Sequence, residues 1–189
     1  MSIVRANIIG ALWIAWVVYW FVAARDAKPD RRQESGLSRA SHIVPLGLAA
    51  WLLWAPTMPG FLGARFLPDT AATYCAGVVV LALGLGFSIW ARRVLGRNWS
   101  GIVTVKQDHE LVRSGPYRWV RHPIYTGLLI AFAGTAISRG EWRGVLAVAV
   151  VFAALWRKLR LEERWMLETF GAAYLRYRGD VKALIPFVL

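Results

Sequence analysis

Five long apolar stretches do most to decide what this chain of 189 residues can fold into. A helix that crosses a bilayer needs about 20 mostly apolar residues. The chain is 57% hydrophobic, which is more than a soluble core of this size requires. The stretches are, by residue number, 8–24, 43–62, 71–91, 125–138 and 145–156. The sequence therefore predicts an all-α, polytopic membrane protein with about five transmembrane helices, forming one integral membrane domain over residues 1–189.

The distribution of charge separates a membrane protein from a nucleic-acid-binding one. The formal net charge is +12, and strongly basic chains commonly bind either nucleic acids or membrane surfaces. The segments between the stretches alternate, with four Lys and Arg residues on one side of the expected membrane and 19 on the other. The positive-inside rule then puts the N-terminus outside and the C-terminus in the cytoplasm. We expect a lipid bilayer as partner, no nucleic acid, and a location in the inner membrane of a bacterium.

Prolines and glycines indicate where the helices begin, end and pack. The second stretch contains three prolines, so its helix either ends near Trp54 or is broken there. The third contains three glycines, which suit close packing of helices. The fifth is expected to continue into the following charged segment as one long helix, which Gly171 ends after Phe170.

The polar chemistry is concentrated in the second half of the chain. Residues 1–94 are interpreted as a transmembrane scaffold and residues 95–189 as the catalytic, cofactor-binding half. The three histidines are scattered and there is a single cysteine, so no metal site is predicted. The chain also has no glycine-rich dinucleotide or phosphate loop, so a nucleotide-like cofactor would not be held by a Rossmann domain.

Two polar segments stand out. Arg121 and His122 directly precede an apolar stretch, and Pro123 would take the first helical position. A helix N-terminus beside a guanidinium and an imidazole suits an anionic or polar ligand, although the same residues could anchor a helix at the lipid headgroups. Further on, Lys158 and Glu162 are one helical turn apart on one face, as in a ligand site or a solvated charged helix.

The segment 109–127 resembles the signature of the isoprenylcysteine carboxyl methyltransferase and phospholipid methyltransferase superfamily, and the Glu162-Glu163 pair is similar to its later pattern. The matching residues of the first segment are His109, Leu111, Val112, Gly115, Pro116, Tyr117, Arg121, His122, Pro123, Tyr125 and Gly127. The resemblance implies an S-adenosylmethionine pocket at the cytoplasmic ends of the C-terminal helices. Its expected cofactor-binding residues are His109, Leu111, Val112, Tyr117, His122, Pro123, Tyr125 and Glu162. The expected catalytic residues are Arg121, Lys158 and Glu163.

The resemblance also implies a methyltransferase that acts on a lipophilic or prenylated substrate, with isoprenylcysteine-type carboxyl O-methylation as the leading hypothesis. Carboxyl methyltransferases of the superfamily have an Arg where this chain has Lys158, and Lys cannot clamp a carboxylate with two parallel bonds. Phosphatidylethanolamine N-methylation therefore stays an alternative, in which Glu163 would act as the base. A non-catalytic transporter or scaffold is an alternative of another class, and a reductase of the same fold is a further one.

Overall fold

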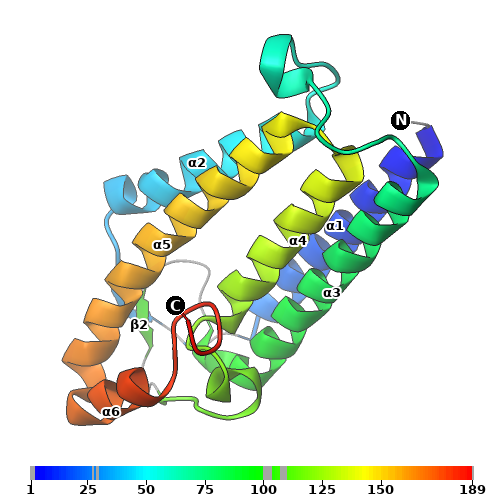
Figure 1. The fold of residues 1–189 in the computed structure, drawn as a ribbon. Coiled ribbons are helices and arrows are strands. Elements are labelled where there is room, and N and C mark those ends of the chain that lie inside the picture. The colour runs from blue at the N-terminus through cyan, green and yellow to red at the C-terminus, as the bar shows by residue number, and fades with distance from the viewer. Residues whose placement is uncertain (1–2, 27, 29, 100–103, 107–109, 189) are drawn as a thin grey trace.

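The computed structural model describes residues 3–26, 28, 30–99, 104–106 and 110–188. Five long helices run alternately from one end of the molecule to the other (Figure 1). They are α1 (Ile3–Ala24), α2 (Gly36–Trp54), α3 (Ala71–Leu95), α4 (Pro123–Arg139) and α5 (Trp142–Phe170), and the short α6 (Ala172–Asp180) follows. Helices α1, α3 and α4 lie side by side, whereas α2 packs on α5, and α5 joins the two groups through α4.

The observed helix ends agree with the prolines and glycines that predicted them. Helix α4 begins at Pro123, and α5 ends before Gly171, which has a φ of 49° that suits a residue without a side chain. The second stretch, expected at residues 43–62, is a helix that starts earlier, at Gly36, and ends at Trp54. This decides between the two alternatives, because the helix stops before the proline-rich turn and does not continue through it.

A two-stranded antiparallel ribbon is the main departure from an all-α chain. It pairs β1 (Asp30–Gln33) with β2 (Thr104–Lys106). Both segments follow helices, α1 and α3, that end at the same end of the molecule (Figure 1). Neither segment has the alternating apolar pattern by which a strand is recognised, so the pairing depends on the helices that bring them together. Short 3-10 turns complete the connections at Gly60–Gly63 (η1), Gly96–Asn98 (η2) and Gly115–Arg118 (η3).

Helices α3 and α4 approach each other closely through glycines. A Cβ atom added at Gly84 would lie 2.5 Å from the backbone nitrogen of Ala131, and one at Gly127 would lie 2.7 Å from the carbonyl oxygen of Gly84. Gly77 is packed equally tightly, whereas a Cβ at Gly86 would meet nothing within 4 Å. The close packing expected of α3 is therefore confirmed for two of its three glycines, Gly77 and Gly84.

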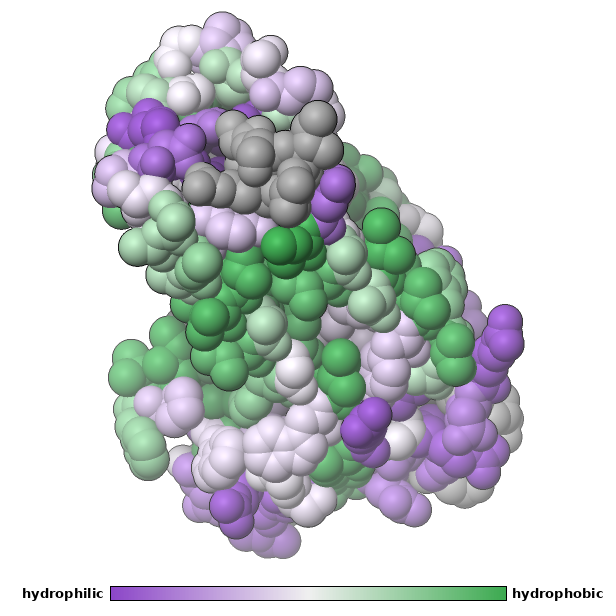
Figure 2. Space-filling view, turned by 90° about the vertical axis from the view of Figure 1, so that its right-hand side faces the viewer, coloured by the Kyte–Doolittle hydropathy of each residue, from purple (hydrophilic) through white to green (hydrophobic). Residues whose placement is uncertain are grey.

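Apolar side chains cover the outside of the helices. Figure 2 shows a broad hydrophobic band across the middle of one face, between hydrophilic ends. Large side chains such as Phe21 on α1 and Leu83 on α3 are exposed. Among the described residues, Asn7–Ala24 and Ala71–Asn98 are long and apolar enough to cross a membrane by length and composition. This surface suits lipid better than water.

Candidate functional site

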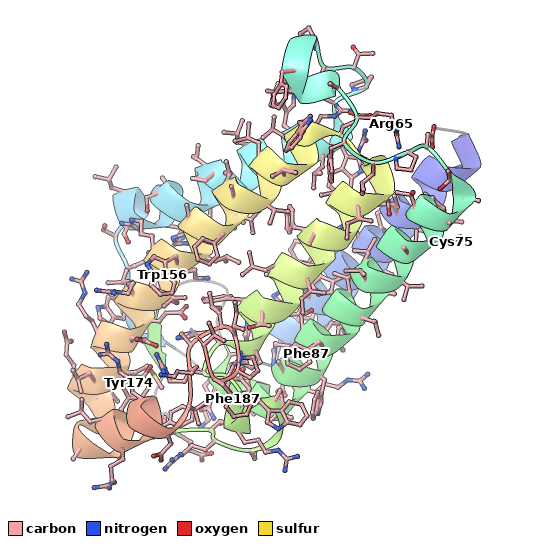
Figure 3. The ribbon with its side chains drawn as sticks, in the orientation of Figure 1. Arg65, Cys75, Phe87, Trp156, Tyr174 and Phe187 are labelled. Carbon is pink, nitrogen blue, oxygen red and sulfur yellow. The ribbon has the colours of Figure 1, made fainter. Side chains whose placement is uncertain are left out.

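The candidate site lies where the C-terminal segment folds back onto the start of α4, at the end of the molecule where Figure 3 shows Tyr174. The backbone N–H of Arg121 donates to the carbonyl of Lys182 at 2.8 Å, and that of His122 donates to Ala183 at 3.0 Å. These bonds fix the chain just before α4 begins. They thereby set the direction of the Arg121 and His122 side chains.

Glu163, on α5, holds Arg121 and His122 together. Its Oε1 atom accepts hydrogen bonds from Arg121 Nε at 2.8 Å and Nη2 at 2.5 Å, and it lies 3.3 Å from His122 Nε2. The Nη1 atom of Arg121 also donates to the carbonyl oxygen of Val181. The three charged side chains are only 7% to 10% exposed. Because buried ions must be paired, these residues form one unit rather than separate contacts.

The side chain of Glu162, the preceding residue on α5, lines the cavity and contacts three polar groups there. Tyr125 donates its hydroxyl to Glu162 Oε1 at 2.5 Å, His122 Nδ1 lies 3.6 Å from Oε2, and Lys158 Nζ lies 4.0 Å from Oε1. The rings of His122 and Tyr125 are stacked, with centroids 5.4 Å apart. The Lys158 ammonium lies over the Tyr125 ring at 5.5 Å. His122 thus lies between the carboxylates of Glu162 and Glu163 and connects the residues that each of them contacts.

The electrostatics favour the charged forms of these side chains. Burial on its own lowers the pKa of His122, but the hydrogen bonds and charges of Glu162 and Glu163 raise that pKa above its ordinary value. Burial on its own raises the pKa of both carboxyl groups. His122 and then Lys158 nevertheless lower the pKa of Glu162, and His122 with Arg121 lowers the pKa of Glu163 to about 2. The arrangement therefore favours an imidazolium between two carboxylates.

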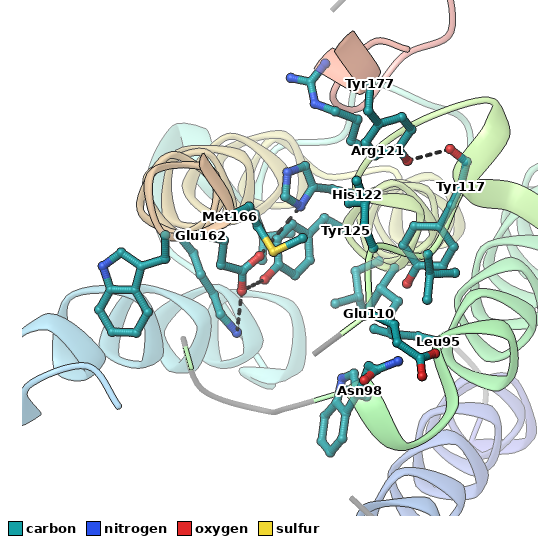
Figure 4. A pocket seen from close by; sticks show the side chains of 18 of the residues that line it. Leu95, Asn98, Glu110, Tyr117, Arg121, His122, Tyr125, Glu162, Met166 and Tyr177 are labelled. Carbon is teal, nitrogen blue, oxygen red and sulfur yellow. Dashed lines mark hydrogen bonds and ion pairs between the residues drawn. The ribbon is translucent and has the colours of Figure 1, made fainter. Parts of the chain in front are cut away.

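A cavity of about 270 Å³ lies beside these groups. Figure 4 shows Glu162 and His122 on one side of it and Tyr117 and Asn98 on the other. Eight of the residues expected to bind cofactor or act in catalysis line this cavity. They are Leu111, Val112, Tyr117, Arg121, His122, Tyr125, Lys158 and Glu162. The structure therefore brings together two segments that are about 40 residues apart in the chain.

Three expected site residues are placed differently. Pro123 begins α4 and is buried without bordering the cavity. Glu163 lies behind the cavity wall, where it pairs with Arg121 and His122. His109 lies outside the described residues.

Aromatic residues from distant parts of the chain complete the cavity wall, and none of them was expected there. The additional lining residues include Trp16, Trp20, Leu46, Asn98, Trp99, Trp165, Met166, Tyr174 and Tyr177. The sequence does hold one signal, because Trp13, Trp16 and Trp20 recur on a single face of α1. The same residues are also typical of a membrane interface, so their type alone does not assign them to a cavity.

Comparisons with known proteins identify the family to which the chain belongs. The family model described as phospholipid methyltransferase matches residues 72–173, more than half of the chain. A protein-S-isoprenylcysteine O-methyltransferase of Saccharomyces cerevisiae is 32% identical over 118 residues, covering 59% of this chain and 48% of the yeast protein. That of Schizosaccharomyces pombe is 35% identical over 136 residues, covering 69% of this chain and 55% of its own length.

A solved structure is similar as well. It is that of a eukaryotic intramembrane Ras methyltransferase, ICMT (isoprenylcysteine carboxyl methyltransferase), with a TM-score of 0.53 and 27% sequence identity. The match covers 80% of this chain and 52% of that one. This chain spans about half the length of the relatives that it matches. By its family match, its motifs and its fold, the chain belongs to the phospholipid methyltransferase family, within the superfamily that also contains the isoprenylcysteine carboxyl methyltransferases.

Proposed function

We propose that this chain is an integral membrane methyltransferase that uses S-adenosylmethionine to methylate the carboxylate of an isoprenylcysteine or a similarly lipophilic acid. The observation that carries the proposal is the cavity, in which buried cations and anions on one side face aromatic and aliphatic side chains. Such a chamber suits a substrate with a charged head and an apolar tail. The names of the yeast relatives support the choice of isoprenylcysteine.

The polar residues present fit the charged groups of S-adenosylmethionine. Glu162, whose pKa is lowered, would hold the ammonium group, and His122 would keep that carboxylate in place. Arg121 and the N-terminus of α4 would supply positive potential for the carboxylate. Tyr117 or Tyr125 would present a ring face to the sulfonium or to the adenine.

Asn98 offers a further contact for the cofactor. It lines the cavity, and its Oδ1 atom is buried with no hydrogen-bond partner among the described residues. A buried acceptor without a partner is costly, so a ligand that donates to it is favoured. The amide of Asn matches the edge of adenine, whose amino group would donate to this oxygen. Leu111 and Val112 would then flank the base.

For the proposed reaction, the protein must mainly align the reactants and exclude water. S-adenosylmethionine, when bound, would supply an electrophilic methyl group on a sulfonium, which the acceptor would attack in line while the thioether of S-adenosylhomocysteine leaves. An acceptor carboxylate is already ionised and needs no base. Lys158, which lies over the Tyr125 ring at the cavity, would orient that carboxylate. Glu163 does not line the cavity, so we assign it a positioning role for Arg121 and His122.

We further propose that α1 to α5 each cross the membrane, with the N-terminus outside and the site at the cytoplasmic ends of the helices. The alternation of Lys and Arg between the two ends of the molecule supports this orientation. We propose the bacterial inner membrane as the location. Residues 95–189 would carry the cofactor chemistry, while residues 1–94 would form the scaffold and, through Trp16, Trp20 and Leu46, part of the cavity wall.

Phospholipid N-methylation is the second candidate, and the description of the matching family favours it. An amine acceptor must first lose a proton, which requires a base. Glu163 suits this role poorly, since its pKa is lowered to about 2 and its Oε1 atom is engaged by Arg121. Among the described residues, the other carboxylates that line the cavity are Glu110 and Glu162, and the pKa of Glu162 is also lowered.

The proposal is tested in two steps on detergent-purified protein. Calorimetric titration should give saturable, micromolar binding of S-adenosylmethionine. Methyl-labelled cofactor should then label N-acetyl-S-farnesylcysteine, whereas vesicles containing phosphatidylethanolamine should take up no label. Labelling of phosphatidylethanolamine instead would establish the second candidate. Absence of cofactor binding by folded protein would overturn both and favour a scaffold or a different chemistry.

A further inference from the structure

Helix α1 presents two different faces. One carries Trp16 and Trp20, which line the cavity. The other carries large apolar side chains that are well exposed, such as Ile14 (66%) and Phe21 (73%). Only 6% of the segment Asn7–Ala24 is buried inside the molecule. Helix α1 is therefore a thin partition, with the cavity on one side and an apolar outer surface on the other.

The cavity-facing indoles of α1 are held in fixed positions. Trp16 Nε1 donates to Ser88 Oγ, on α3, at 2.8 Å. The rings of Trp16 and Trp20 stack with centroids 4.4 Å apart, and Trp20 meets the Trp99 ring edge-on at 5.6 Å. The Arg92 guanidinium in turn lies 4.6 Å from the Trp99 centroid. We call Trp16, Trp20 and Trp99 the aromatic wall, since all three border the cavity.

The aromatic wall lies away from the reacting groups. We call five of the ionisable and hydroxyl residues that line the cavity the polar wall: Arg121, His122, Tyr125, Lys158 and Glu162. The polar wall is carried by α4, its approach segment and α5, whereas α1 packs on α3 (Figure 1). A molecule whose charged head meets the polar wall would therefore extend its apolar part towards the aromatic wall. Leu46, Leu128 and Leu155 line the same cavity and keep it apolar.

Because the cavity is small, the aromatic wall would limit the length of the apolar chain that the cavity can hold. Its volume of about 270 Å³ is below the 300–1,000 Å³ that single drug-sized ligands usually occupy. A cavity of this size that also holds the cofactor leaves limited room for a prenyl chain. The length of prenyl chain that the cavity accommodates then depends on the residues at the apolar end of the cavity. Rigid indoles there resist displacement, because their hydrogen bond and ring contacts hold them in place.

We propose that Trp16 and Trp20 are specificity-determining residues that limit the length of the acceptor's apolar chain. The inference rests on the proposed function and adds a property that the shared machinery does not supply. Both residues lie outside the region 72–173 that matches the family model. The proposed length limit would therefore belong to α1, outside the region that matches the family model.

The test compares acceptors of three lengths, the S-geranyl, S-farnesyl and S-geranylgeranyl derivatives of N-acetylcysteine, with methyl-labelled cofactor. Trp16→Leu and Trp20→Leu should each raise the ratio of kcat/KM for the geranylgeranyl probe over the farnesyl probe by about tenfold, as expected when space is added to an apolar pocket. Trp13→Leu is the matched control. Trp13 lies on the same helix and bonds Thr135 Oγ1 at 3.1 Å, but it does not border the cavity. Its ratio should stay within about twofold of wild type.

Cofactor affinity by calorimetry should be unchanged in all three variants, which separates a change of pocket length from a general loss of structure. Should Trp16→Leu fail to fold, Trp16→Phe removes the bond to Ser88 while keeping a ring. If the wild-type enzyme methylates the farnesyl probe, an unchanged probe ratio in Trp16→Leu and Trp20→Leu would overturn this inference alone. So would an equal change in Trp13→Leu. A wild-type protein that methylates none of the three probes overturns the proposed carboxyl methylation and this inference with it.

Discussion

The two walls of the cavity are built from different parts of the chain and are held by different forces. The polar wall consists of side chains held by hydrogen bonds and ion pairs, such as the 2.5 Å hydrogen bond from the Tyr125 hydroxyl to Glu162 and the 3.6 Å ion pair of His122 with Glu162. The aromatic wall consists of rings held by one hydrogen bond and by ring contacts at 4.4 to 5.6 Å. The first kind of contact is specific and costly to break, whereas the second tolerates changes of ring and size.

This difference suggests how one family can serve several acceptors. All five residues of the polar wall lie within residues 72–173, which match the family model. Two of the three members of the aromatic wall lie before that region. A chain can therefore keep its ionic machinery while α1 and α2 change the apolar chamber. Changes to the polar wall and to its support should accordingly be severe, and changes near the aromatic wall should alter preference.

Glu163→Ala should produce the largest effect, although Glu163 lies behind the polar wall. The change leaves the buried Arg121 guanidinium without its carboxylate partner and leaves His122 with Glu162 alone. Breaking a buried ion pair in this way costs about 3–5 kcal/mol of stability. The melting temperature in detergent should fall steeply, and cofactor binding should be lost with it. Glu168→Ala, an exposed position on the same helix, is the control. Similar melting of both variants would contradict the positioning role of Glu163.

Acid should weaken the ion pairs of Glu163 with Arg121 and His122 without any mutation. The pKa of Glu163 is lowered to about 2 from an ordinary 4.5, so its contribution to stability is present above pH 4.5 and is lost as the pH falls towards 2. The pKa of His122 is raised above 6.5, so its contribution is present below that pH and is lost as the pH rises through its higher folded value. Melting curves between pH 7 and about pH 3 should therefore show an acid loss that Glu163→Gln largely lacks. A parallel acid loss in Glu163→Gln would assign it to other carboxyl groups.

Much of the polar wall could be predicted from the sequence, because its residues are local. Arg121, His122 and Tyr125 form one short motif, and Lys158 with Glu162 follows helical spacing. The resemblance to the superfamily's pattern assigned these residues to a site, because the helical spacing of Lys158 and Glu162 also fits a solvated charged helix.

What could not be predicted depends on distant packing. Adjacent residues of a helix point about 100° apart, so only the position of α5 against α4 decides that Glu162 borders the cavity and Glu163 does not. The pairing of His122 with Ala183 joins segments about 60 residues apart. The β1–β2 ribbon and the aromatic wall depend on long-range contacts of the same kind.

Glu162→Gln tests the polar wall directly. The change keeps the shape of the side chain but removes the charge that is proposed to hold the ammonium group of the cofactor. A hydrogen bond to a charged group contributes about 1.5–3 kcal/mol, so the Kd for S-adenosylmethionine should rise about tenfold to a hundredfold. Calorimetry measures this directly. An unchanged Kd would show that the ammonium group binds elsewhere.

Lys158→Met should affect the acceptor and spare the cofactor. Lys158 lies over the Tyr125 ring, at the edge of the ion-pair range from Glu162. Without its ammonium group, the KM for N-acetyl-S-farnesylcysteine should rise about tenfold, while the Kd for S-adenosylmethionine stays within a factor of about two. Lys158→Arg should restore the lower KM, since a guanidinium also orients carboxylates. A rise in KM that Lys158→Arg does not reverse would argue against a role in binding the carboxylate.

Asn98 lines the cavity and directly precedes Trp99 of the aromatic wall in the chain. Its buried Oδ1 atom, which has no hydrogen-bond partner among the described residues, is proposed to accept from the amino group of adenine. A single neutral hydrogen bond contributes about 0.5–1.5 kcal/mol, so the expected effect is small, about twofold to tenfold. The sensitive measurement is therefore a ratio, the Kd for S-inosylhomocysteine divided by that for S-adenosylhomocysteine. Inosine has a carbonyl oxygen in place of the amino group and would oppose Oδ1, so the wild-type ratio should exceed one. Asn98→Leu should bring the ratio close to one, because neither base then has a partner at this position. A ratio that Asn98→Leu leaves unchanged would place the amino group of adenine away from Asn98 and leave the buried oxygen to another donor.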